Sequence, residues 1–161
     1  LQDLSTKNTV EYQKLNQVSN IVLEFMDSSP SVNSIMNALA NLPPGDARHG
    51  IATSVISIAI CDEMGITQKS VFEKIAFASL AHDLGMALIP KEIMSKPKHL
   101  WTPDDHAVFQ QHPILSVEML RDVKEVTNDI LLAIVEHHEN AQGTGYPKRI
   151  RDVKISPLGR I

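Results

Sequence analysis

The stretch IAFASLAHDLG, residues 75–85, is an apolar run that ends in His82 and Asp83 and is closed by Gly85. An uncharged run of this kind favours a buried helix, and the two polar residues then lie where that helix ends. A single buried histidine is ordinarily a neutral side chain that is hydrogen-bonded to a neighbour. An adjacent aspartate changes the interpretation, because a buried carboxylate is costly unless it is paired or bound to a metal. Imidazole and carboxylate together suit a transition-metal ion.

Helical periodicity extends from this stretch in both directions. Apolar residues recur at three- and four-residue steps through most of the chain, which is typical of amphipathic helices. Thr102 before a proline is a helix-start signal, and Gly65 is a helix-ending residue. No stretch shows convincing strand alternation. We therefore predict an all-α bundle with helices over residues 12–25, 32–42, 47–63, 70–81, 103 to a break at 112–113, 114–121 and 129–138, and a last helix that opens at Ser156.

The breaker Pro43-Pro44-Gly45 divides the chain. All seven histidines follow it, and the residues before it carry no evident chemistry. We predict an N-terminal helical segment over residues 1–44, whose two helices pack on the rest or connect to an upstream domain, and a second domain over residues 45–161. Two heptads are too few to argue for a dimerising coiled coil in the first segment. A homodimer is an open alternative for the protein as a whole.

Composition limits the classes of function. The chain has 161 residues, 43% of them hydrophobic, which is enough for one compact core. A net charge of -4 gives no basic footprint, so duplex nucleic acid is not an expected partner. Cys61 is the single cysteine, which excludes a disulfide within the chain and fits a reducing cytoplasm. No membrane segment or signal peptide is visible, and a chain that begins at Leu1 is expected to be part of something longer.

Two adjacent histidines, His137 and His138, end another predicted helix. Neighbouring residues differ by about 100° around a helix, so both rings reach one ion only where the helix is ending. The alternative is that one ring faces inward and the other faces solvent. His99 and His106 lie beside Lys and Asp, and we expect them to be solvated.

The order and spacing of the remaining histidines connect these signals. His49 begins a predicted helix and His112 lies at a helix break, and each alone is more typical of a cap or a surface residue. Together with the other two motifs, they lie at or near helix ends separated by one helical hairpin, so they can converge on one point of a bundle. Six such ligands exceed one tetrahedral ion and indicate two.

Several motifs follow one another in a fixed order along the chain: His49, AHDLG (81–85), His112-Pro113, HHE (137–139) and GTGYP (143–147), with ISPLGRI (155–161) as further context. This order resembles the HD-GYP family, a branch of the HD-domain metal-dependent phosphohydrolases. The resemblance covers residues 45–161 and implies an HD-domain helical bundle. It also implies hydrolysis of cyclic di-GMP, a bacterial second messenger, to the linear dinucleotide or to GMP.

The resemblance also implies a metal centre of two divalent transition-metal ions, iron first and manganese next. Asp83 then bridges the ions and is the catalytic residue. The family has a further aspartate ligand shortly after the LGRI segment, which we expect beyond Ile161. The implied ligands in this sequence are His49, His82, Asp83, His112, His137 and His138.

Residues 143–147, here called the GYP loop, are the implied substrate-binding segment. Gly143 and Gly145 permit backbone angles closed to other residues, which lets the loop fold over the site. Tyr146 offers a ring to a guanine and a hydroxyl to a phosphate, and Pro147 stiffens the exit. The alternative is an ordinary tight turn with a packed tyrosine.

Three positions depart from the family pattern. Met86 stands where the family has a lysine associated with a substrate phosphate, so a cation is lost from a phosphate site. Gln142 stands where many members have aspartate, and Gly45 where members with a third ion have glutamate, which favours two ions. The first two departures motivate an alternative: a module that binds metal and nucleotide, or docks a GGDEF-type cyclase through the GYP loop, without turnover. A general HD phosphohydrolase acting on another nucleotide is a further alternative, against which the GYP loop argues.

Overall fold

The structure is a computed structural model that describes residues 2–28 and 30–161, with side chains from Tyr12 onward. The residues it describes form α-helices and 3-10 turns and contain no strand, so the predicted all-α class is confirmed. The chain forms two compact units, Leu1–Ala81 with Ile161 and His82–Arg160. The predicted boundary at residues 43–45, between an N-terminal segment and a second domain, stays a prediction.

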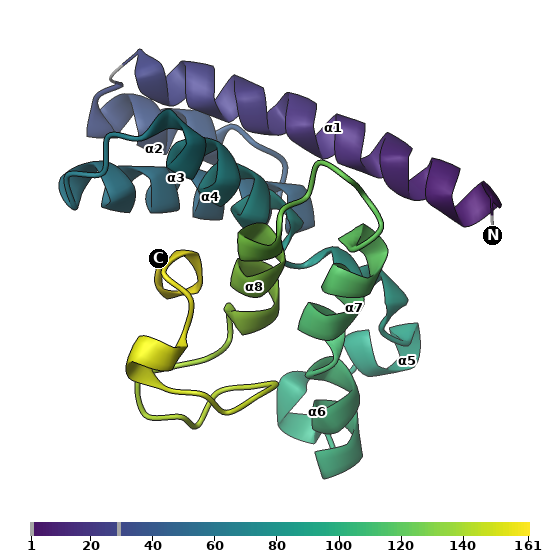
Figure 1. Cartoon of the computed structure of the whole chain (residues 1–161). Helices are drawn as coiled ribbons and strands as arrows, with labels where there is room; N and C mark the ends of the chain where they lie inside the picture. Colours follow the sequence, from purple (N-terminus) through teal and green to yellow (C-terminus); the bar gives the residue numbers. More distant parts are fainter. Residues whose placement is uncertain (1, 29) are drawn as a thin grey trace. The chain divides into compact units, whose positions relative to one another are not determined.

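The first unit is built from four helices, with α1 lying against α3 and α4. The rings of Tyr12 and Phe77 meet with centroids 5.2 Å apart. The α3 and α4 helices approach closely at Ser54, whose hydroxyl donates to the Ala76 carbonyl at 3.3 Å. In Figure 1 these elements are α1 (Gln2–Asp27), α2 (Val32–Ala40), α3 (Asp46–Glu63) and α4 (Lys69–Ala81).

Local sequence sets the ends of these helices. Helix α2 stops at Ala40, two residues earlier than predicted, and the Asn41 side chain donates to the Asn37 carbonyl at 2.9 Å. Gly65 follows the end of α3 with a φ of 74°, a left-handed conformation that glycine adopts at little cost. The predicted helix-ending role of Gly65 is therefore confirmed.

The second unit carries short elements around the helices α7 and α8. Thr102 begins α6 with a capping box: its hydroxyl accepts the Asp105 N–H, and the Asp105 carboxylate accepts the Thr102 N–H. Leu120 and Ile134 are fully buried in the core of this unit. The elements are η1 (Leu84–Leu88), α5 (Lys91–Met94), η2 (Lys98–Leu100), α6 (Pro103–Phe109), α7 (His112–Leu120), α8 (Asn128–Glu136), η3 (Asp152–Lys154) and η4 (Leu158–Arg160).

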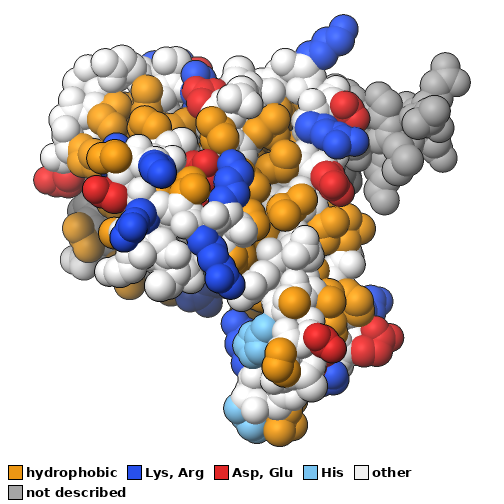
Figure 2. Space-filling view, turned by 60° about the horizontal axis from the view of Figure 1, so that its bottom comes forward, with side chains coloured by type: hydrophobic (Ala, Val, Ile, Leu, Met, Phe, Trp, Pro, Cys, Tyr) orange, Lys and Arg blue, Asp and Glu red, His pale blue; other side chains and the backbone are white. Residues whose placement is uncertain are grey.

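The surface mixes side chains of all kinds. Figure 2 shows acidic, basic and hydrophobic side chains interspersed on one face. Among the exposed hydrophobic residues, Ile56, Ile60 and Met64 follow one face of α3. No helix among the described residues is long and apolar enough to cross a membrane.

Candidate metal centre

His82 and Asp83 begin the second unit and are anchored by α7. His82 is buried, and Asp83 directly precedes η1. The hydroxyl of Ser116 on α7 is the anchor: it accepts the Gly85 N–H at 2.8 Å and lies 2.8 Å from the His82 carbonyl. A methyl group on Gly85 would overlap the His112 carbonyl, so η1 and the start of α7 are in direct backbone contact. Backbone packing therefore sets where Asp83 stands relative to His112.

The imidazoles of His112 and His137 are held in one tautomer by the backbone. His112 is the first residue of α7 and is fully buried, and His137 follows the last residue of α8. The Nδ1 atom of His112 lies 2.8 Å from the Phe109 carbonyl, and that of His137 lies 2.7 Å from the Ile134 carbonyl. A carbonyl oxygen only accepts, so Nδ1 carries the proton in each ring. In a neutral ring Nε2 then carries a lone pair.

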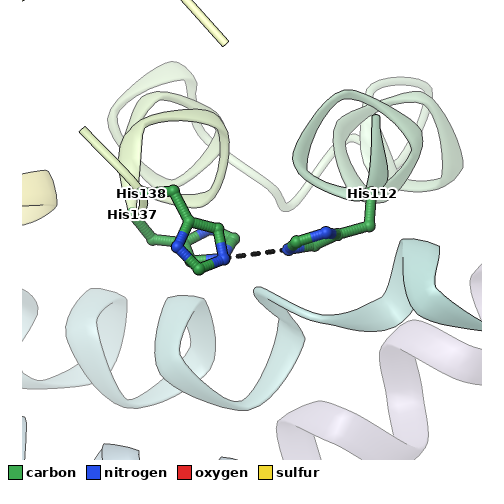
Figure 3. A group of neighbouring side chains, drawn as sticks. All are labelled: His112, His137 and His138. Atoms are coloured by element: carbon green, nitrogen blue, oxygen red, sulfur yellow. Dashed lines mark hydrogen bonds between the residues drawn. The ribbon is translucent and has the colours of Figure 1, made fainter. Parts of the chain in front are cut away.

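These lone pairs point at one another and at a carboxylate. The Nε2 atoms of His112 and His137 are 3.3 Å apart, as the dashed line in Figure 3 shows. The Asp83 Oδ1 atom lies 3.3 Å from His112 Nε2 and 3.7 Å from His137 Nε2. Three acceptors at such distances repel unless a proton or a cation lies among them. The two Nε2 atoms and the Asp83 oxygen therefore fit the ligand shell of a metal ion. A hydrogen bond from Nδ1 to a backbone carbonyl is the usual support of a metal-binding histidine.

The side chains of His82 and His138 extend the cluster. The other oxygen of Asp83, Oδ2, lies 3.2 Å from His82 Nε2. The rings of His137 and His138 have centroids 4.2 Å apart, and His138 meets the His112 ring edge-on at 5.0 Å. His112, His137 and His138 each offer a ligand atom, and these atoms lie within 4.8 Å of one another. Asp83, with two oxygens facing different imidazoles, can serve two ions.

Burial determines the charge state of the cluster. It lowers the pKa of His137 to about 3 and that of His138 to about 4, so both rings are neutral at pH 7. Burial acts to raise the pKa of Asp83, whereas a positive charge shared between its oxygens and the imidazoles of His112 and His82 lowers it, and the net shift is downward. An ionised carboxylate beside neutral imidazoles is the protonation state that binds a divalent cation.

Comparison with known proteins identifies the family. Residues 33–161 match the family model of the HD domain. The chain belongs to the HD-domain family. Among relatives of this HD domain is a cyclic di-GMP phosphodiesterase of Pseudomonas aeruginosa, 31% identical over 113 residues, which are 70% of this chain and 27% of the relative. A cyclic di-GMP phosphodiesterase of Thermotoga maritima is 31% identical over 143 residues, 86% of this chain and 38% of the relative.

A solved structure supports the same fold. An HDG"Y"P protein from Bdellovibrio bacteriovorus matches with a TM-score of 0.71 and 24% identity, over 96% of this chain and 48% of that one. At this identity the match establishes the fold alone. The chain spans only about a quarter to two-fifths of the curated relatives described above.

The GYP loop of this HD domain is folded by Asn140. The Asn140 side-chain oxygen accepts the N–H groups of Gln142 and Thr144, both at 3.1 Å. Gly143 is left-handed, with a φ of 73°. A Cβ on Gly145 would overlap the backbone of His138 and Glu139, so only glycine permits this approach. The loop thereby brings Tyr146 onto His138, with ring centroids 4.4 Å apart and planes 25° apart.

Two carboxylates hold the chain that follows the loop. The Oε1 atom of Glu139 accepts the N–H groups of Lys148 at 2.6 Å and Arg149 at 3.0 Å. Buried Glu136 accepts the Ser156 N–H at 2.8 Å and lies 3.4 Å from the Lys148 ammonium. The acids on either side of the histidine pair therefore fix the exit of the GYP loop.

The second unit brings together five of the six predicted ligands: His82, Asp83, His112, His137 and His138. His49 lies on the first turn of α3 in the first unit, where its side chain is exposed, and its role as a ligand stays a prediction. His99 and His106 are exposed as expected, and the His106 ring lies against Trp101.

Sequence reasoning missed Ser116, which anchors the segment of His82 and Asp83, and it missed the part that Glu136 and Glu139 play in holding the chain after the GYP loop. Ser116 had a signal, since it stands one helical turn after His112 and so on the same face of α7.

Proposed function

We propose that the chain is the hydrolytic domain of a metal-dependent phosphodiesterase, which opens cyclic di-GMP to the linear dinucleotide or cleaves it to GMP. The observation that carries the proposal is the group of acceptor atoms around Asp83, which fits a metal cation. The relatives named cyclic di-GMP phosphodiesterases supply the substrate class.

The proposed centre holds two divalent transition-metal ions, with iron the first choice and manganese the second. Asp83, whose two oxygens face different imidazoles, would offer one oxygen to each ion. Bound ions supply Lewis acidity, which lowers the pKa of water and offsets negative charge on a phosphate. The ligands are His49, His82, Asp83, His112, His137 and His138.

The GYP loop positions the substrate in this proposal. Tyr146 lies against His138, at the edge of the cluster, where its ring can stack on a guanine. Burial raises the pKa of the Tyr146 hydroxyl to about 12, so at neutral pH it carries its proton and donates to a phosphate oxygen. Gly143, Gly145 and Pro147 hold the backbone in the shape that presents the ring.

The first test is metal content and single turnover. We expect protein purified without chelator to hold more than one transition-metal ion per chain, and to convert cyclic di-GMP when loaded with Fe(II) or Mn(II). Asp83→Ala should abolish the product. Asp122→Ala, which removes an exposed carboxylate at the far end of α7, should leave it unchanged. Less than one ion per chain after supplementation would refute the metal centre.

Met86 and Gln142 favour a second candidate, a module that binds metal and nucleotide, or docks a GGDEF-type protein through the GYP loop, without turnover. Full metal loading with tight cyclic di-GMP binding and no product in either metal would select this candidate. A panel of other cyclic dinucleotides tests the remaining alternative. Turnover of one of them but not of cyclic di-GMP would indicate an HD phosphohydrolase of different specificity.

A further inference from the structure

A lysine stands beside the histidine cluster, separated from it by one aromatic ring. The ammonium of Lys98, in η2, lies 5.9 Å from the centroid of Trp101 and 5.5 Å from that of Phe109. The Phe109 ring in turn lies 4.9 Å from the His112 ring. Both aromatic residues belong to the segment that leads into α7. Because Phe109 packs on His112, the Lys98 ammonium lies near the edge of the cluster.

The turn that carries Lys98 is firmly built. The Trp101 indole N–H donates to the Lys96 carbonyl at 3.1 Å. The Lys96 ammonium donates to both oxygens of Asp105 at 3.1 Å, and Asp105 also takes part in the capping box of α6. The charge of Lys96 is therefore matched by a carboxylate.

The charge of Lys98 is matched by aromatic faces only. Within the part of the chain that the structure describes, no carboxylate pairs with Lys98, and its side chain is exposed. A cation held over two half-buried rings is held more weakly than one bonded to a phosphate. The long flexible stem also lets the ammonium swing toward an incoming anion.

The ring under this ammonium packs on the cluster. Phe109 lies against His112, and the His112 ring lies 5.0 Å from that of His138. Tyr146 stacks on His138 with ring centroids 4.4 Å apart. Lys98 and Tyr146 therefore both border the same group of imidazoles.

We propose that Lys98 is a substrate-contacting residue, whose ammonium binds a phosphate group at the metal centre. This inference rests on the proposed function. Lys98 would supply the positive charge of the phosphate site, which the uncharged side chain of Met86 does not supply. The ligand class is a phosphate monoester or diester, since one ammonium distinguishes charge and not base identity.

The experiment measures the binding of inorganic phosphate to the Mn(II)-loaded chain by calorimetry, with metal content determined for every variant. Trp101 is the only tryptophan of the sequence, so its fluorescence shows whether each variant keeps the turn that carries Lys98. We expect Lys98→Gln to weaken phosphate binding about ten- to a hundredfold, the usual effect of losing one charge-assisted hydrogen bond. Lys98→Arg should retain most of the affinity. Lys124→Gln, an exposed lysine beyond the far end of α7, should match wild type.

The outcomes separate this inference from the proposed function. Equal phosphate affinity in Lys98→Gln and wild type, no phosphate binding in wild type, or loss of metal from Lys98→Gln would each overturn the role of Lys98. Lys98-dependent phosphate binding without turnover of cyclic di-GMP would support Lys98 and refute the proposed phosphodiesterase. Turnover of cyclic di-GMP together with phosphate binding that does not depend on Lys98 would support the proposed phosphodiesterase and refute the role of Lys98.

Discussion

Gly85→Ala tests whether backbone packing positions the metal centre. Gly85 lies two residues after Asp83 and faces the first turn of α7. Its added methyl group would overlap the His112 carbonyl and would lie 2.7 Å from the Ser116 nitrogen and 2.8 Å from the Leu115 Cβ. Two of these three atoms belong to the backbone of α7 and cannot rotate away. The structure must therefore respond by moving η1 and α7 apart.

The size of the response follows from these contacts. Ordinary van der Waals contact begins at 3.4 Å, so η1 and α7 must separate by at least 0.7 Å (3.4 Å less 2.7 Å). Overpacking of this kind costs about 1–3 kcal/mol. For a chain of this size the melting temperature should fall by about 2–12 °C. The same shift lengthens the 3.3 Å approach of Asp83 to His112, and displaced ligand supports typically cost about ten- to a hundredfold in metal affinity.

The assay is Mn(II) titration together with thermal unfolding of the metal-free protein. Gly50→Ala is the matched control, because a Cβ on this buried helical glycine would meet the Leu80 carbonyl at an ordinary 3.4 Å. Alanine in a helix should leave the control equally stable or more stable, by up to about 1 kcal/mol. If Gly85→Ala keeps wild-type melting temperature and Mn(II) affinity, the reasoning that η1 is seated on α7 is refuted.

Three further results are expected. Ser116→Ala leaves the buried Gly85 N–H without its acceptor and should lower the free energy of unfolding by about 1–3 kcal/mol in urea titrations; an unchanged midpoint would contradict this. Burial lowers the pKa of His137 to about 3 and of His138 to about 4, so below about pH 6.5 the unfolded chain binds protons that the folded chain refuses. The metal-free protein should therefore lose stability from pH 6.5 toward pH 4, by at most about 1.4 kcal/mol per pH unit for each histidine and less for half-buried His138; a flat profile would contradict it. Arg149→Gly relieves a φ of 54° and should raise stability by about 0.5–1 kcal/mol, measured by thermal unfolding, whereas a lower melting temperature would count against strain at this residue.

The sequence predicted the long helices well and the short elements poorly. Periodicity needs several turns to show, and α1, α3 and α4 each supply them. Between Leu84 and Leu100 the chain forms η1, α5 and η2, each too short for a pattern. Their positions come from tertiary contacts such as the hydrogen bond of Gly85 to Ser116, which joins residues 31 positions apart and leaves no local signal.

For the candidate site, residue types and their order carried the prediction. The sequence predicts His82, Asp83 and the pair His137-His138 at helix ends, and the structure has them there. His112 alone would have been taken for a cap or a surface residue, yet it is fully buried. Its burial depends on how α7 packs against η1 and α8, which spacing along the chain does not reveal.

The four residues from Glu136 to Glu139 have a consequence for how this protein can vary among species. Two acids bond the returning chain, and the two imidazoles between them meet the cluster. Each residue advances about 100° around the helix end. Inserting or deleting a single residue here would therefore put a carboxylate where an imidazole now meets the cluster. The same change would put an imidazole where a carboxylate now bonds the returning chain. Length changes should be absent from these four positions in functional homologues, and should be tolerated at the exposed residues Arg151 and Asp152, where η3 begins.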